Sequence, residues 1–252
     1  MPNPLSKANL QKKNATQPKA QFGRAAILLA AVKLAALKGL ANISLGDLAA
    51  EIGMSKSGLY AHFETREELE AAIVETAITI LDQEVLQPAF KARPGIERLR
   101  VVTNAFLSYL ERKVFPRGCF IAAVSLELES RPGAACDLVA GALDQWVALL
   151  RQCIVEGQDL GEITPNIEVT QVVFEIQAML FTSNFLFVMS DNVVQLTQAR
   201  AGVENVVTRI AIGSDPKKNR SKKNERRSGP RRKAAPPALI DAVVASRGIT
   251  PD

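Results

Sequence analysis

The chain has 252 residues, of which 47% are hydrophobic and 5% aromatic, so it can bury a core in one small and one larger domain. Its single histidine and three cysteines, none in a Cys-X-X-Cys pair, argue against a histidine-based metal site, a histidine-dependent triad and a disulfide framework. The formal net charge of +5 hides an uneven distribution along the chain, and with no secretory segment visible we expect a cytoplasmic protein without metal or cofactor.

The first predicted elements are three helices near the N-terminus. After an apolar helix over residues 24–38, the run SLGDLAAEIGMSKSGLYAHF (44–63) predicts two short helices joined by a tight turn. Ser44 can cap the first of them, and Asp47 can return a bond to the backbone N–H of Ser44. Gly53 can then adopt the positive φ that ends this helix sharply.

The second short helix is expected to present polar groups to solvent. Ser55 caps it, while Leu59 and Phe63 fall on its inner side. Thr65 and Glu68 form a further predicted capping box, which opens the next helix. The residues expected to face outward are Lys56, Ser57, Gly58, Tyr60 and His62.

These motifs carry a family resemblance. The run SLGDLAAEIGMSKSGLYAHFETREEL is similar to the DNA-binding segment of the tetracycline-repressor (TetR) family, with its Ser or Thr cap, Leu-Ala pair, Gly turn, Leu-Tyr and Phe. Residues 22–43 resemble the family's first helix. Two positions depart from the pattern. Met54 stands where Val is common, and Arg66 replaces a Lys that touches phosphate but keeps its charge.

The resemblance and the outward groups together predict a DNA contact surface. Lys56, Ser57 and Gly58 are expected to approach base edges, with Gly58 letting the backbone come close, whereas Tyr60 and His62 are expected to bind phosphate together with Arg66. An N-terminal arm is expected beside a narrow groove. The full set of expected DNA-binding residues is Lys19, Arg24, Ser44, Ser55, Lys56, Ser57, Gly58, Tyr60, His62 and Arg66.

The rest of the chain predicts further helices, because no strand alternation persists and Pro-Gly breakers separate apolar-periodic stretches. We therefore expect an all-α fold. The most apolar stretch, 169–189, is interrupted by Glu175 and predicts a buried interface helix rather than a membrane span. The expected helices cover 24–38, 45–52, 55–61, 66–91, 95–114, 118–130, 133–157, 167–190 and 192–212.

The C-terminal half resembles the effector domain of one TetR subgroup, in GCFIAAVSLELESRPGAACDLV (118–139) and DLGEITPN (159–166). The resemblance implies a homodimer joined through its last long helices and an unidentified small-molecule effector. Expected dimer contacts are Trp146, Leu149, Leu150, Phe181, Phe185, Val193 and Leu196. Residues expected to line an apolar effector pocket are Phe106, Tyr109, Phe120, Trp146, Phe174 and Met179, although plain core packing remains the alternative for each.

Charge separates the two ends of the chain from its middle. Residues 1–24 carry +5, residues 214–233 carry +8 and residues 234–252 carry −1, which leaves −7 for residues 25–213. Basic ends of this composition are expected to be disordered and to suit a phosphate backbone. The expected domains are a basic arm (1–20), an N-terminal three-helix helix-turn-helix DNA-binding domain (21–68), a larger helical effector-binding and dimerisation domain (69–213) and a basic tail (214–252).

The predicted function is sequence-specific transcriptional regulation, by a repressor that a small apolar effector releases from a near-palindromic DNA operator. Such modules work in pairs, because one recognition helix reads only a few base pairs. The alternative is a DNA-associated helical adaptor that has no ligand control and binds mainly through its basic ends. An enzyme is not expected, since no paired acids, nucleophile or phosphate loop is visible. The expected location is the bacterial cytoplasm, on the nucleoid.

Overall fold

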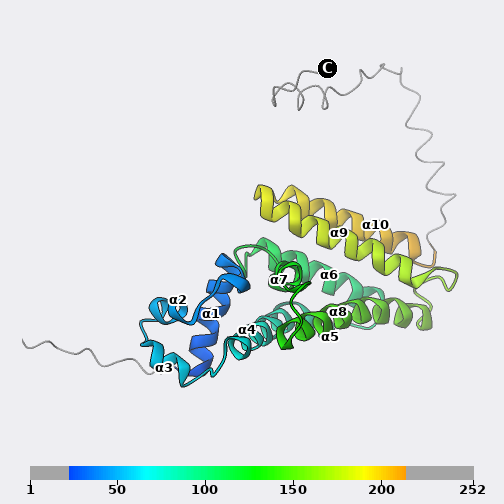
Figure 1. Cartoon of the computed structure of the whole chain (residues 1–252). Coiled ribbons are helices and arrows are strands. Elements are labelled where there is room, and N and C mark those ends of the chain that lie inside the picture. The colour runs from blue at the N-terminus through cyan, green and yellow to red at the C-terminus, as the bar shows by residue number, and fades with distance from the viewer. Residues whose placement is uncertain (1–22, 214–252) are drawn as a thin grey trace, which may run out of the picture. The chain divides into compact units, whose positions relative to one another are not determined.

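The computed structural model describes residues 23–213, and all regular elements in that range are helices (Figure 1). The expected all-α class is confirmed. The predicted basic arm and tail, and with them Lys19, lie outside the described residues.

Three helices and a short 3-10 turn form the N-terminal unit, which we call the head (residues 23–65). They are α1 (Arg24–Lys38), η1 (Leu40–Asn42), α2 (Leu45–Glu51) and α3 (Lys56–Tyr60). Local capping explains where the short helices begin. The Ser44 side chain accepts from the Asp47 N–H at 3.0 Å, and the Ser55 side chain accepts from the Gly58 N–H at 3.1 Å. Gly53 ends α2 with a φ of 67°, as predicted.

The remaining helices form the body (residues 66–213). They are α4 (Arg66–Leu81), η2 (Asp82–Leu86), α5 (Gln87–Lys91), α6 (Ile96–Glu111), α7 (Phe120–Leu128), α8 (Ala134–Asp159), α9 (Val169–Ser190) and α10 (Val194–Ile210). Every expected helix is present, with ends that differ by at most three residues. The predicted helix over 66–91 contains a π-helical stretch, η2, which ends two residues before Pro88. Pro88 has no N–H to continue the α-helical ladder.

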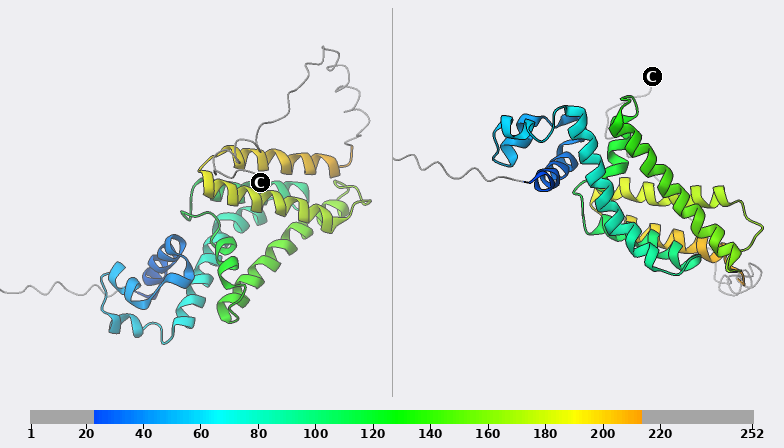
Figure 2. Two further views of the ribbon diagram at one scale, coloured as in Figure 1. Left: turned by 45° about the horizontal axis from the view of Figure 1, so that its top comes forward. Right: turned by 90° about the horizontal axis from the view of Figure 1, so that it is seen from below.

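One continuous hydrophobic core joins the head to the body. Helix α4 packs against α1 of the head on one side and against α8 of the body on the other, so it links the two parts. Helices α9 and α10 lie side by side along the body, as both views in Figure 2 show. Gly202 allows their close approach, because a side chain at that position would collide with Met179.

Helix α9 turns a continuous apolar face outward. Phe174, Phe181, Phe185 and Met189 are exposed along this face, while Ile176 and Leu180 on the opposite face are buried. Both α8 and α9 are long and apolar enough to cross a membrane by length and composition, with 28% and 39% of the respective windows buried. Core and interface helices meet the same criterion, so the observation does not by itself assign a membrane segment.

Three of the expected dimer contacts are wrong. Leu149, Leu150 and Leu196 are buried in the core of the subunit itself, where no partner could reach them. The apolar periodicity of each helix identifies a buried face but not what covers it. Among the other expected contacts, Phe181, Phe185 and Val193 are exposed, and Trp146 is half-buried.

Candidate nucleic-acid interface and internal cavities

The polar side chains at the start of α2, Ser44 and Asp47, form the N-terminal cap of this helix. The Ser44 hydroxyl donates to the Asp47 carboxylate at 2.6 Å, and the same carboxylate accepts the Ser44 N–H at 3.2 Å. The hydrogen bond from the Ser44 side chain lowers the pKa of Asp47 below its ordinary value. Ser44 was expected to bind DNA, and in this structure its hydroxyl is held by the cap, with only its remaining exposed surface open to a phosphate.

The first turn of α3 carries the most accessible polar side chains. The Ser55 hydroxyl caps the Gly58 N–H and lies 3.2 Å from the Ser57 hydroxyl, so Ser57 extends the polar surface. The Lys56 side chain lies across α2, with its Nζ 3.4 Å from the position that a side chain on Gly46 would occupy. Lys56, Ser57 and Tyr60 are all exposed. They form a polar edge able to donate hydrogen bonds to phosphates and bases.

The glycine and the histidine of this segment face partly inward. Added at Gly58, a side chain would meet the Ser55 hydroxyl at 3.2 Å and the Met54 methyl at 3.4 Å, so the missing side chain makes room within the turn. His62 is half-buried, with its ring 6.5 Å from that of the buried Phe63. Close backbone approach at Gly58 and phosphate binding by His62 stay predictions.

Two arginines expected to bind phosphate form contacts within the chain. The guanidinium of Arg24 lies 4.9 Å from the ring centre of Phe63 and pairs with Glu68 at 3.4 Å. Arg66 donates to Glu70 at 2.8 Å and to the carbonyl oxygen of Ala41 at 2.6 Å. Both side chains remain about half exposed, so phosphate binding is sterically open to them and stays a prediction.

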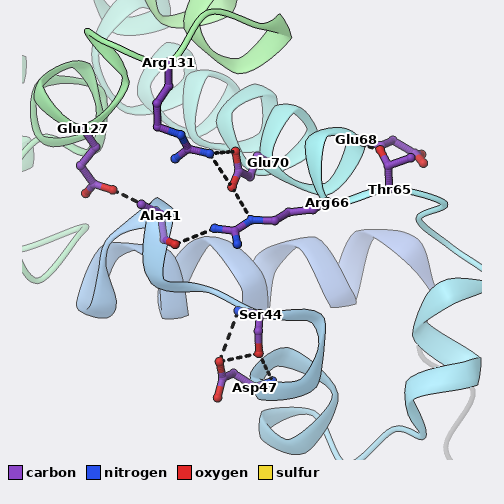
Figure 3. A network of polar contacts seen from close by, with 9 residues as sticks. All are labelled: Ala41, Ser44, Asp47, Thr65, Arg66, Glu68, Glu70, Glu127 and Arg131. Atoms are coloured by element: carbon purple, nitrogen blue, oxygen red, sulfur yellow. Dashed lines mark hydrogen bonds and ion pairs between the residues drawn. The ribbon is translucent and has the colours of Figure 1, made fainter.

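A set of contacts between head and body was not foreseen from the sequence (Figure 3). The Glu127 carboxylate on α7 accepts the N–H of Ala41 in η1 at 3.0 Å. Arg131, just after α7, donates to Glu70 at 3.0 Å. The spacing of Arg66 and Glu70 by four residues was a local signal for one pair, but no local signal connects Glu127 to a backbone group 86 residues away.

A small apolar cavity, partly open to solvent, lies in the body and is walled mainly by α6, α7, α8 and α9. It has a volume of about 60 Å³, and the rings of Phe106 and Trp146 in its wall are 5.3 Å apart. No lining side chain is charged, and Gln177 supplies the one amide. Its complete lining is Leu81, Phe106, Cys119, Ile121, Ala122, Ala142, Leu143, Trp146, Gln177, Leu180 and Phe181.

A larger hollow of about 310 Å³ lies where α1, α7 and α9 meet. Phe120 lines it, and so does the carboxylate-bearing Glu127. Ala122 and Phe181 belong to the walls of both cavities, so the two are separated by no more than these side chains and the backbone of α7.

The six expected pocket residues do not form one pocket. Phe106 and Trp146 line the small cavity, and Tyr109 is buried behind Phe106, with its ring stacked at 6.1 Å. Phe120 lines the larger hollow, and Met179 lines a groove between α9 and α10. Phe174 is wrong as a pocket residue, because it is 67% exposed on the outer face of α9.

Three ionisable side chains of the body, Tyr109, Cys119 and Cys153, are buried. Burial is the main cause that raises the pKa of Tyr109 and of Cys119. Burial also raises the pKa of Cys153 to about 11. Over residues 23–213, no cluster of three or more His, Cys, Asp or Glu side chains is placed to hold a metal ion.

Comparison with known families covers both parts of the chain. Residues 27–73 match the family described as "Bacterial regulatory proteins, tetR family". Residues 95–203 match the family described as "Tetracyclin repressor-like, C-terminal domain". Together the matches span more than half of the chain. The transcriptional repressor DhaR of Mycobacterium sp. (strain GP1) is 25% identical over 127 residues, which are 50% of this chain and 62% of DhaR, so this similarity spans less than two thirds of that relative.

Solved structures show the same fold. A TetR transcriptional regulator from Chloroflexus aurantiacus superposes with a TM-score of 0.70 at 22% identity, over 75% of this chain and 95% of the other. AibR, solved in complex with isovaleryl coenzyme A and operator DNA, gives a TM-score of 0.59 at 20% identity, over 74% of this chain and 97% of AibR. A TetR-family regulator from Cytophaga hutchinsonii gives 0.66 at 20% identity, over 75% and 94%.

Proposed function

This chain belongs to the TetR family of bacterial regulatory proteins, and we propose that it is a sequence-specific repressor that a small uncharged effector releases from its DNA operator. The observation that carries the proposal is the capped helix α3, which presents Lys56, Ser57 and Tyr60 on one exposed edge of the head. A short helix presented this way fits the major groove of DNA. A protein with this task works in the bacterial cytoplasm, on the nucleoid.

A homodimer supplies the second recognition helix that a palindromic operator requires. The apolar face of α9 gives the surface for it, with Phe174, Phe185 and Met189 exposed along one side of the helix. Beside it, the exposed Ala201 of α10 and the groove between α9 and α10 allow a second helix pair to approach closely. Burial of this face against a second copy removes apolar surface from water on both subunits, which favours the dimer.

The DNA-binding part of the proposal is tested by selection and substitution. A duplex enriched from a random library by the full-length protein serves as the operator in fluorescence anisotropy at fixed salt. Lys56→Ala is expected to weaken operator binding by about 5- to 150-fold, the range for one base contact. Lys91→Ala removes the same charge from an exposed site in the body and is expected to change little. Equal losses in both variants, or no enriched sequence, would contradict base reading by α3.

The lining of the small cavity defines the effector class. Its wall is apolar and uncharged, and the Gln177 amide has no hydrogen-bond partner in the described part of the chain. An ionised ligand would lose its hydration there without compensation. The cavity therefore suits a compact, mainly apolar molecule with one carbonyl or hydroxyl group. AibR shows that this fold can hold a ligand and operator DNA in one complex, although the cavity here has no group to pair with phosphates.

Trp146 gives a direct assay for such ligands, because it is the only tryptophan and lies in the cavity wall. A panel of small uncharged ketones, alcohols and alkanes is screened for a change in its emission and for release of the operator. Gln177→Leu is expected to weaken the binding of ketones and alcohols more than that of alkanes. Gln145→Leu, on the exposed side of α8, serves as the control. If no compound in the panel changes the emission of Trp146 or operator binding, this effector class is excluded.

A further inference from the structure

Helix α7 is attached at one end to α9 and at the other end to the head. At its N-terminal end, the Asn184 side chain of α9 accepts the N–H of Cys119 at 2.9 Å. At its C-terminal end, Glu127 accepts the N–H of Ala41 in the head at 3.0 Å. Between these points α7 contributes Ala122 to the walls of both cavities. One short helix thus connects the buried side of α9, the cavities and the head.

A second set of contacts reaches the same residue of the head. Arg131 donates to the Glu70 carboxylate, which is 7% exposed, and Glu70 also accepts from Arg66 at 2.8 Å. Arg66 then donates to the carbonyl oxygen of Ala41 at 2.6 Å. The N–H of Ala41 is therefore bound by Glu127 of α7. Its carbonyl oxygen is bound by Arg66, which Glu70 links to Arg131 in the loop after α7 (Figure 3).

Because Ala41 lies shortly before α2 and α3 in the chain, these contacts can affect the position of both helices. Ala41 lies in η1, three residues before the Ser44 cap of α2, so a shift of Ala41 is passed along the backbone to the start of α2. Hydrogen bonds to ionised groups are short and strong compared with neutral ones. The Glu70 carboxylate is nearly buried, so the loss of Arg131 or Arg66 leaves it with one partner instead of two.

We propose that Glu127, Arg131, Glu70 and Arg66 form a latch on Ala41 that sets the orientation of the head, and that a ligand opens it by displacing α7. The inference rests on the proposed function. The small cavity holds about 60 Å³, well below the roughly 300–1,000 Å³ of common ligand sites, so an effector must displace part of its wall. Ala122 lies five residues before Glu127 in the same helix, so a shift of that wall moves the carboxylate away from Ala41.

The first experiment measures the latch without any ligand. Amide hydrogen exchange at Ala41 is followed by NMR in the full-length wild type, in Glu127→Ala and in Glu127→Gln, which keeps an acceptor oxygen. Exchange is expected to quicken at least tenfold in Glu127→Ala and less in Glu127→Gln. Glu129→Ala, which removes an exposed carboxylate just beyond α7, is the matched control and is expected to leave Ala41 unchanged. Equal exchange in Glu127→Ala and Glu129→Ala overturns the latch.

The second experiment imitates a ligand from within the chain. Ala142→Leu and, separately, Leu143→Phe add volume to the cavity wall on α8, opposite α7. A change in Trp146 emission reports that the cavity is altered. Each variant is expected to quicken exchange at Ala41 and to weaken binding of the selected duplex by about tenfold, within the usual range of coupling between two sites. Altered Trp146 emission with wild-type exchange at Ala41 would overturn the coupling through α7.

The two proposals fail in different ways. If the wild type prefers no duplex sequence, the proposed function fails, whereas the exchange at Ala41 still reports whether Glu127 holds the head. If the wild type prefers one duplex and Glu127→Ala binds it with the affinity of Glu129→Ala, the proposed function stands and the latch fails. Because Arg131→Ala breaks the other contact, its effect combined with Glu127→Ala is expected to be non-additive, as both act on Ala41.

Discussion

The polar contacts within the head and those within the body differ in how far apart in the sequence their partners lie. In the head, the capping bonds join residues three apart, as in Ser44 with Asp47 and Ser55 with Gly58. In the body, most ion pairs join residues far apart in the chain, as in Arg100 with Glu204 and Arg98 with Glu156. A locally specified head keeps its shape when it moves, and a body braced by separated contacts can transmit a shift. This difference suits a protein in which the head binds a DNA sequence and the body regulates that binding.

The largest expected effect is a loss of stability of the head relative to that of the body. Phe63 is fully buried in the head under the guanidinium of Arg24. Phe63→Ala is expected to cost about 3–5 kcal/mol, because it removes a buried ring and leaves a cavity. Denaturation is followed by far-UV circular dichroism, which reports all helices, and by the emission of Trp146, which reports the body. An early loss of helix signal before the Trp146 transition is expected; one shared transition would show that head and body unfold as a unit.

The next effect concerns the apolar face of α9. Phe185 is 58% exposed, and Phe185→Glu places a charge in the centre of the proposed dimer surface. We expect the dimer to weaken by at least about 2 kcal/mol, as for a central interface residue. Analytical ultracentrifugation measures the change, with the exposed Leu160→Glu as the control. If the dimer of Phe185→Glu forms with unchanged affinity, the dimer interface lies on another face of the protein.

A smaller effect tests the local character of the head. Ser44→Ala removes the cap of α2 and is expected to cost about 1 kcal/mol. The same change should raise the pKa of Asp47 towards its ordinary value of 3.8, since the Ser44 side chain is the main cause of its lowering. Because the pKa is depressed in the folded state, the contribution of Asp47 is present above the unfolded pKa and is lost as the pH falls through the folded pKa. An NMR titration of the Asp47 carboxyl in both proteins checks the direction.

The smallest expected effect lies on the surface of the body. Arg100 and Glu204 form a close but exposed pair, and the hydrogen bond from Arg100 lowers the pKa of Glu204. Arg100→Ala is expected to change stability by less than about 1 kcal/mol, and less still at high salt. Thermal melts at two salt concentrations measure it. A loss comparable to that of Phe63→Ala would mean that exposed ion pairs, rather than the hydrophobic core, supply most of the stability of the body.

The same contrast explains what the sequence could predict. The caps at Ser44 and Ser55 were predictable because their partners are three residues away. The box at Thr65 was right in part: its side chain accepts from the Glu68 N–H, but the Glu68 carboxylate accepts from Glu64, one residue earlier than expected. Helix positions followed from apolar periodicity and from breakers, both of which are local signals.

Long-range features were predictable only as classes of residue. Periodicity showed that Leu150 and Phe174 lie on apolar faces, but not that the first is core and the second is exposed, because that depends on which helices pack there. Phe181 and Gln177 complete the small cavity only once α9 is placed against α7 and α8. The latch contact between Glu127 and Ala41 depends on the tertiary fold alone.

The central claim is that the head reads sequence, and the specificity ratio tests it most directly. The ratio compares the dissociation constants of the full-length protein for its selected duplex and for a scrambled duplex at one salt concentration. We predict a ratio of at least about a thousand, as for specific DNA-binding proteins. Deletion of residues 1–20 and 214–252 should lower both affinities and keep most of the ratio. A ratio near one, or one that vanishes with the basic ends, would contradict the account and favour binding through charge alone.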